Sequence, residues 1–213
     1  MIHGFKGNKT TTAEEWLINY SLRTGNLIDI NPDLLDMPIK FDGTEVDAFI
    51  LDIIDNKLVI QLILPMKEKF DDKSNRYETS YVRELINSNE FLSRFNPEFV
   101  KHVQLTEVHT EDYVTNDKLW LLSHEEVNQY SNYLRPNHEC HAFEMFKTID
   151  LEAYSRVSLK NKDAYGWRLR SAYSIPTAAS NGLVGSVNEY GYVNYYGAIH
   201  ADVGALFPVC TIC

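Results

Sequence analysis

The sequence predicts an α+β fold built from antiparallel β-hairpins and two or three short helices. The apolar stretches 45–54 and 57–64 flank Asp55-Asn56, a natural two-residue hairpin turn. The spacing Ser/Thr-x-x-Glu, which marks the start of a helix, occurs at Thr12 and again at Ser123. In the C-terminal part of the chain, short β-like stretches alternate with turn residues.

Each remaining element follows from the local pattern of apolar and turn residues. In the N-terminal part we expect a loose segment over 1–11, a short helix from Thr12 to Gly25 and a connector over 26–38. After the hairpin we expect a loop over 67–75, a helical region over 81–99 broken at Asn96-Pro97, strands over 103–114 and 118–122, and a helix over 123–134. The chain then continues with irregular structure over 137–163 and strands over 167–170, 183–188, 192–196 and 205–213. The economical division is an N-terminal helix and connector, residues 1–37, followed by one domain over 38–213.

Composition and charge limit the classes of partner. With 44% hydrophobic and 23% charged residues, the 213-residue chain has the composition of an ordinary globular protein. Its 20 Lys and Arg against 30 Asp and Glu give a net charge of −10, which repels phosphate backbones, so we expect no direct nucleic-acid binding. Solubility is the favoured interpretation of this acidity. The alternative is mimicry of nucleic acid in a basic partner groove, but the carboxylates are dispersed.

The sequence also carries signals about cellular location. The N-terminus has no apolar region typical of a secretory signal, and the longest apolar run, 58–66, is too short to span a membrane and is interrupted by Gln61. The odd number of cysteines, three, fits a reducing interior better than a disulfide framework. We expect a protein that is made in a cytoplasm, stays there or is assembled into a virion, and has no membrane partner.

Tyrosine and asparagine side chains crowd together near the C-terminus. The group comprises Asn181, Asn188, Tyr190, Tyr192, Asn194, Tyr195, Tyr196 and His200. Tyrosine supplies a large amphipathic contact area at low entropic cost, and asparagine supplies adaptable hydrogen bonds, which is the chemistry of binding surfaces. The alternative is that about half of these tyrosines point inward from alternating strands and form the core under the sheet.

Zinc-type ligands occur in two segments, His138-Glu139-Cys140-His141 and Cys210-Thr211-Ile212-Cys213. In a terminal strand, residues i and i+3 point to opposite faces, which separates Cys210 from Cys213. Buried or incidental cysteines are therefore favoured over a zinc site. We predict neither a metal nor a cofactor.

Carboxylates that could serve catalysis gather only in the predicted strand over 103–114. Its period of two places Glu107, His109, Glu111 and Tyr113 on one face, with Asp112 on the other. Two carboxylates beside an imidazole could hold a metal or tune the pKa of the histidine, but a solvated strand face is the favoured interpretation. No nucleophile-elbow, zinc-protease, phosphate-loop or dinucleotide motif occurs, so no enzymatic activity is expected.

Several short motifs, in order, resemble those of one known family. Residues 41–64 look like its opening hairpin, and residues 80–95 (SYVRELINSNEFLSRF) are similar to its S-x-x-R-x-x-L-N-x-x-F-L helix. Residues 117–127 (DKLWLLSHEEV) resemble its D-K-x-F-L-L-S-x-x-E element, and residues 167–171 (WRLRS) resemble its W-x-L-R-S motif. Residues 183–196 are similar to its V-x-x-x-G-x-V hairpin, and residues 209–212 to its ending. The resemblance, which covers roughly residues 40 to 213, is to an uncharacterised domain family frequent in phages, prophages and gut-type Firmicutes. The C-terminal half of that family resembles the fold of C-type lectins and formylglycine-generating enzymes.

The chain departs from the family motifs at three positions. Arg168 stands where a second tryptophan is frequent, Ala172 replaces a proline, and Phe207 replaces the arginine of the G-V-R-P-A ending. We expect Arg168 or Arg170 to take over what that arginine holds in place. No cysteine spacing here matches the site of the formylglycine-generating enzymes, so their activity is not implied.

The resemblance implies a C-type-lectin-like domain in which the C-terminal strands and loops carry the ligand surface. We therefore expect a non-catalytic binding module of phage or prophage origin that recognises a protein or a glycan, on the host surface or on the virion. The expected ligand-binding residues are Trp167, Arg170, Asn188, Tyr190, Tyr192, Asn194, Tyr195 and Tyr196. The alternative function is an acidic intracellular inhibitor of a host defence nuclease.

Overall fold

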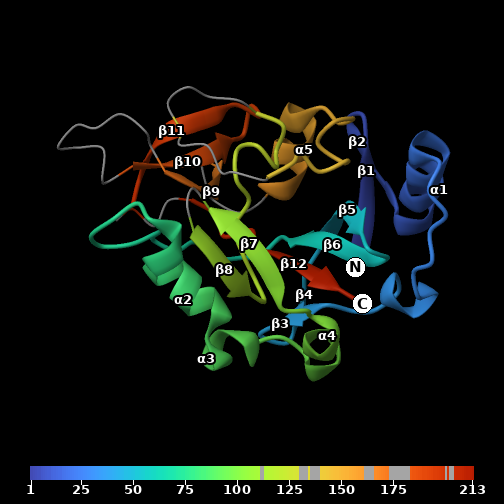
Figure 1. Ribbon diagram of the computed structural model, residues 1–213, viewed down its shortest axis with the longest axis horizontal. Helices are drawn as coiled ribbons and strands as arrows, with labels where there is room; N and C mark the ends of the chain where they lie inside the picture. The colour runs from blue at the N-terminus through green and yellow to red at the C-terminus, as the bar shows by residue number, and fades with distance from the viewer. Residues whose placement is uncertain are drawn as a thin grey trace.

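The protein was analysed as a computed structural model that describes residues 1–110, 113–129, 134, 140–160, 166–172, 183–199, 201 and 204–213, with only the backbone of 195–197. Within these residues the fold is α+β, as predicted. A five-stranded mixed sheet has the strand order β12-β6-β5-β1-β2, and a three-stranded antiparallel sheet has the order β11-β10-β9. Two further pairs, β3 with β4 and β7 with β8, stand apart from these sheets (Figure 1).

The five-stranded sheet joins both ends of the chain. Its strands are β1 (Ile2–Lys6), β2 (Lys9–Thr12), β5 (Ala48–Ile54), β6 (Lys57–Leu62) and β12 (Val209–Ile212). The predicted hairpin is confirmed as β5 and β6, and both turn residues, Asp55 and Asn56, have positive φ, 50° and 56°, as a tight hairpin turn requires. The C-terminal strand β12 pairs antiparallel with β6, and the N-terminal strand β1 pairs parallel with β5.

The prediction of a loose N-terminus is wrong, because residues 1–11 contribute to the strands β1 and β2. Ile2 and Phe5 are buried in the same hydrophobic core as the C-terminal strand. The sequence hid these strands because their buried residues, Ile2, Gly4 and Phe5 of β1 and Thr11 of β2, do not alternate in the pattern of a half-buried strand. The N-terminal segment therefore shares its sheet and its core with the rest of the chain, and the predicted boundary after residue 37 does not separate two cores.

The predicted first helix is confirmed as α1 (Ala13–Thr24). The hydroxyl of Thr12 accepts the N–H of Glu15 at 3.1 Å, and Gly25 ends the helix at φ 73°. Trp16 and Tyr20 face the sheet and are buried. Within the described residues, every helix is too short or too polar to cross a membrane.

The helical region predicted over 81–99 is confirmed as a run of short helices. They are α2 (Tyr81–Asn87), α3 (Asn89–Leu92) and α4 (Pro97–His102), preceded by the 3-10 turn η2 (Tyr77–Thr79). Ser80 and Ser88 cap α2 and α3 with their hydroxyls, which explains why the region is divided. Upstream, η1 (Pro32–Leu34), β3 (Lys40–Phe41) and β4 (Thr44–Glu45) form the connector to the central hairpin.

The single strand predicted over 103–114 is in fact a hairpin of β7 (Thr106–Thr110) and β8 (Tyr113–Asp117). Glu107 and His109 share a face, as predicted. Tyr113 does not join them, because it pairs with Thr110 across the reversal, and cross-strand partners share a face. Glu111 and Asp112 lie outside the described residues. The strand predicted over 118–122 is reduced to a bridge from Trp120 to Val209.

The capping box predicted at Ser123 forms, but it does not start a helix. The Ser123 N–H donates to the Glu126 carboxylate at 2.9 Å, and the Glu126 N–H donates to the Ser123 hydroxyl at 3.2 Å. Residues 124–128 form turns, and Asn128 has a φ of 58°, so the prediction of a helix over 123–134 is wrong there. Most of 130–134 lies outside the described residues.

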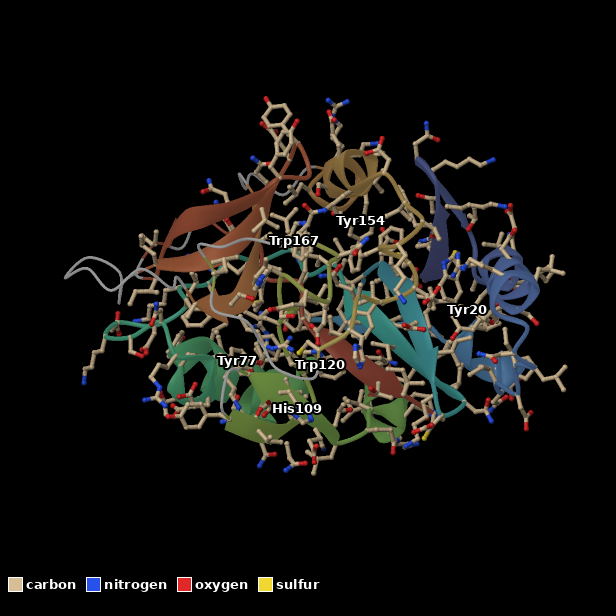
Figure 2. All side chains as sticks on the ribbon, turned by 45° about the horizontal axis from the view of Figure 1, so that its top comes forward. Tyr20, Tyr77, His109, Trp120, Tyr154 and Trp167 are labelled. Atoms are coloured by element: carbon tan, nitrogen blue, oxygen red, sulfur yellow. The ribbon has the colours of Figure 1, made fainter. Side chains whose placement is uncertain are left out.

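The C-terminal strands are confirmed as β9 (Gly166–Ala172), β10 (Leu183–Asn188) and β11 (Val193–Ala198). Irregular structure was expected over 137–163, but α5 (Leu151–Ser158) forms there, and the carboxylate of Asp150 accepts N–H groups of its first turn. The aromatic ring of Tyr154 connects α5 to the sheet, because it packs edge-on against Phe5 and Phe49. Tyr154 is labelled in Figure 2.

Candidate functional site

The turn between β10 and β11, residues 188–192, is held by its own asparagine. The side-chain oxygen of Asn188 accepts the N–H groups of Tyr190 and Tyr192, both at 3.0 Å. The N–H of Gly191 donates to the Asn188 carbonyl at 3.0 Å, and Gly191 has a φ of 76°. We call residues 188–192 the tyrosine turn. Asn188, predicted to bind ligand, uses its side-chain oxygen to shape this turn.

The tyrosine turn rests against the start of α5. A Cβ atom added to Gly191 would lie 2.5 Å from the backbone nitrogen of Glu152 and 2.8 Å from the carbonyl carbon of Leu151. Such a close approach of two backbones requires glycine. Contact with the helix therefore restrains the turn from outside, in addition to the Asn188 hydrogen bonds within it.

Two of the predicted tyrosines project from this restrained turn. Tyr190 is 52% exposed and Tyr192 is 69% exposed. Asn194, on the following strand, is also exposed. The side chains of Tyr195 and Tyr196 lie outside what the structure describes, as do Asn181 and His200.

Trp167 and Arg170, expected on the same surface, are in the interior, with exposures of 0% and 1%. Segments of the chain cover β9 from outside the three-stranded sheet: the N–H of Arg170 donates to the Leu122 carbonyl at 2.8 Å. The ring of Trp167 packs between Tyr154 and Phe207. A surface ligand does not reach either residue in this structure.

Arg170 is the centre of a buried polar network. Its guanidinium donates to both carboxylate oxygens of Glu126, at 2.6 and 2.8 Å, and to the carbonyls of Leu121 and His109. It also lies 3.3 Å from the sulfur of Cys140. The carboxylate that completes the capping box is thus also the counter-ion of a buried cation.

The polar residues of the quoted motifs interlock in the same way. Arg83 of α2 pairs with the buried Asp117 at 2.7 Å, and the N–H of His124 donates to the Ser171 hydroxyl at 2.9 Å. The departure at Arg168 has a role too: its guanidinium donates to the carbonyls of Glu68, Ala198 and Ala201. Arg168 of β9 thus holds carbonyls after β6 and at or just beyond the end of β11, while Phe207 packs as a core residue.

Burial controls the titration of two groups near this network. It lowers the pKa of His124, which also lies beside the Glu125 carboxylate and the Arg170 guanidinium. It raises the pKa of the Cys140 thiol to about 11. The thiol is therefore protonated near neutral pH, and a protonated thiol is a poor nucleophile and a poor metal ligand.

A pocket of about 410 Å³ lies between β7 and the five-stranded sheet. We call it the β7 pocket. Its floor is a row of side chains on neighbouring strands, Thr211 on β12, Val59 on β6 and Asp52 on β5. Trp120, the strand β7 and residues of the segment 140–147 complete the lining. His109 and Trp120 are labelled in Figure 2.

The β7 pocket collects several of the titratable residues noted in the sequence. His109 forms an ion pair with Glu107, with 3.0 Å between Nε2 and Oε1. Cys140 and His141 also line the pocket, and the Cys140 sulfur lies 3.6 Å from the His109 carbonyl oxygen. Cys210 is buried in β12, whereas Cys213 is exposed. Among the described residues, no three His, Cys, Asp or Glu side chains are grouped as a metal would require, and His138 and Glu139 lie outside those residues.

A protein family described as "Domain of unknown function (DUF6273)" matches residues 54–212. The chain belongs to this family. No curated protein and no solved structure matches the chain. The DUF6273 span contains the tyrosine turn, the Arg170 network and every part of the β7 pocket except Asp52.

Sequence patterns revealed one of these two sites in the DUF6273 chain and missed the other. The tyrosine turn follows from local composition. The β7 pocket combines β5, β6, β7, β12 and the segment 140–147, which are far apart in sequence. The signals in advance were the shared face of Glu107 and His109 and the metal-type side chains of Cys140 and His141, and neither pointed to a pocket.

Proposed function

We propose that this DUF6273 protein is a non-catalytic binding module that recognises a protein or a glycan through the tyrosine turn. The observation that carries the proposal is the exposure of Tyr190 and Tyr192 on a turn restrained by Asn188 and by α5. The C-type-lectin-like fold and the phage or prophage origin expected from the motifs belong to the same proposal, with a host-surface or virion component as ligand.

The restraint of the turn supports this role energetically. A binding surface loses affinity when its loops must be ordered on association, and a preorganised loop avoids much of that cost. Each exposed tyrosine adds a flat apolar ring and a hydroxyl with only two side-chain torsions to fix. Two such rings on one turn are typical of the aromatic anchors that dominate binding energies.

The residues with nucleophilic or acid–base chemistry support a non-catalytic role. The Cys140 thiol is protonated near neutral pH, and His124 is buried beside Ser171 and Glu125. Both serve the packing around Arg170. The exposed histidine His141 lines the β7 pocket beside Cys140, whose burial raises its pKa and so disfavours the thiolate that a nucleophile requires.

The test is a double substitution, Tyr190→Ala with Tyr192→Ala, compared with the single substitution Tyr113→Ala. Tyr113 is also an exposed tyrosine, 41%, but it lies on β8. Binding is measured on an array printed with bacterial surface glycans and purified virion proteins, and any hit is titrated in solution. The proposal expects the double variant to lose at least about tenfold in affinity, since anchors of this kind contribute more than about 1 kcal/mol each.

The control measurement is thermal unfolding of all three proteins. Because both tyrosines are exposed, the double variant is expected to melt close to the parent. Unchanged affinity in the double variant would refute the proposal. A large fall in melting temperature would instead show that the tyrosines support the fold.

A further inference from the structure

The β7 pocket has an imbalance of charge. Three of its charged side chains have partners: Glu126 pairs with Arg170, Glu107 with His109, and Lys147 with Glu144. Asp52, on the floor, pairs with no Lys or Arg among the described residues; its carboxylate accepts the N–H groups of Ile53 and Glu144, at 2.7 and 3.1 Å, and a hydrogen bond from the Tyr20 side chain. Lys147 lines the same pocket, but it pairs with Glu144, so this half-buried carboxylate has no ion-pair partner in the part of the chain that the structure describes.

Burial and the neighbouring Glu144 carboxylate disfavour the charge on Asp52. Burial is the largest cause of the raised pKa of Asp52 and the Glu144 carboxylate adds to it, whereas the two backbone N–H groups and the hydrogen bond from Tyr20 oppose it. A cation in the pocket would relieve this penalty, because an opposite charge within a few ångströms favours the ionised carboxylate. An anion would add to the repulsion.

The rest of the lining favours an apolar body on the ligand. Trp120, Val59, Val108, Ala142 and Phe143 contribute most of the surface around the floor. Thr106 and Thr211, joined by a hydrogen bond of 3.1 Å, place hydroxyls among them. A volume of about 410 Å³ lies within the usual range for sites that enclose small molecules.

We propose that the β7 pocket binds a small organic cation, an amine on an apolar or aromatic body, with the ammonium group beside Asp52 and the body against the apolar wall. This site is separate from the tyrosine turn and does not depend on it. The pocket lies on the sheet face shared by Asp52, Val59 and Thr211, whereas the turn rests on α5.

Three probes that share one skeleton test the charge preference: 2-phenylethylamine, 2-phenylethanol and 3-phenylpropionate. Each is titrated calorimetrically into the full chain. The amine is expected to bind at least about tenfold more tightly than the alcohol, the size of one charge-assisted hydrogen bond, and the propionate least. Equal affinity for amine and alcohol, stronger binding of the propionate, or no binding of any probe overturns the proposal.

Two substitutions test the location. Asp52→Asn is expected to remove the preference for the amine and leave the alcohol unchanged. Because Asp52 also holds the N–H groups of Ile53 and Glu144, a second variant, Ala142→Leu, fills the pocket without removing a hydrogen bond and is expected to weaken all three probes. Amine binding that persists in Ala142→Leu places the site elsewhere and refutes the proposal.

Two controls separate this site from general effects. Glu98→Gln removes an exposed carboxylate on α4, outside the pocket, and is expected to leave amine binding unchanged. The Tyr190→Ala, Tyr192→Ala variant is also expected to bind the amine normally. Loss of amine binding in the tyrosine variant would contradict the separation of the two sites, whereas loss of glycan or protein binding alone would concern only the function proposed for the turn.

Discussion

Removal of the charge on Glu126 is expected to destabilise the protein far more than removal of an exposed carboxylate. In Glu126→Gln, the side chain keeps its size and one oxygen that can accept a hydrogen bond from Arg170. The Arg170 side chain, which belongs to a residue only 1% exposed, nevertheless loses its counter-ion. Breaking a buried ion pair from one side costs about 3–5 kcal/mol, and the acceptor kept by glutamine places this variant near about 3 kcal/mol. With a urea m-value of about 2–3 kcal/mol/M, the unfolding midpoint falls by roughly 1–1.5 M.

The matched control is Asp42→Asn, which breaks the pair of Asp42 with Arg94. Both partners are substantially exposed, with side-chain exposures of 53% and 35%, so solvent screens the pair and the expected loss is far smaller than that of Glu126→Gln. Asp42 has a φ of 50°, which asparagine tolerates. Equal urea midpoints for Glu126→Gln and Asp42→Asn would refute the assignment of Arg170 as a buried cation that depends on Glu126.

A double-variant cycle separates the pair from the desolvation of its members. Arg170→Met leaves the Glu126 carboxylate buried with the Ser123 N–H as a donor. Adding Glu126→Gln to Arg170→Met is expected to cost at least about 1 kcal/mol less than Glu126→Gln costs alone, because the cation is already absent. Additive losses would show that the two side chains stabilise the fold independently.

Three further outcomes follow from the same interior and from the turn. Burial lowers the pKa of His124 in the folded state, so on acidification the unfolded chain binds the proton first. The contribution of His124 to stability is therefore fully present above the unfolded pKa of about 6.5 and is lost as the pH drops below it. Between pH 7.5 and pH 5.5, the free energy of unfolding in urea should fall less in His124→Gln than in the parent. Gly191→Ala is expected to lose about 1–3 kcal/mol, because the added Cβ meets the backbone of α5 at a positive φ; an unchanged melting curve would contradict that contact. Iodoacetamide at pH 7.5 should modify the exposed Cys213 before Cys140, because burial raises the pKa of the Cys140 thiol to about 11. Peptide mass spectrometry that shows faster modification of Cys140 would contradict this burial.

Local chemistry made much of the fold predictable. Asp55-Asn56 defines a two-residue turn whatever surrounds it, and Thr12 and Gly25 define the two ends of α1 through their own hydrogen bonds and backbone angles. The same locality explains why composition pointed to the tyrosine turn. These features depend on residues within a few positions of one another.

The errors arose where distant segments decide the structure. The strand β1 has a polar sequence and becomes a strand by pairing with β5, more than 40 residues later in the chain, as its first pair Ile2 with Ala48 shows. The sequence at Glu111-Asp112 has no glycine or proline to mark the reversal between β7 and β8. Arg170 was expected on the ligand surface that the family resemblance implied, and its buried partner Glu126, 44 positions away, gave no sign of the pairing in the sequence.

The motifs that pointed to the family have a structural role in this chain, which bears on where its specificity resides. Arg83 with Asp117 joins α2 to β8, and Glu126 with Arg170 and His124 with Ser171 join the segment 123–126 to β9. Each of these side chains is already engaged by its partner within the chain. Under both proposals, specificity comes from residues outside these contacts, such as Tyr192 on the turn and Asp52 in the β7 pocket. Substitution at those positions should therefore change binding without disturbing the interior.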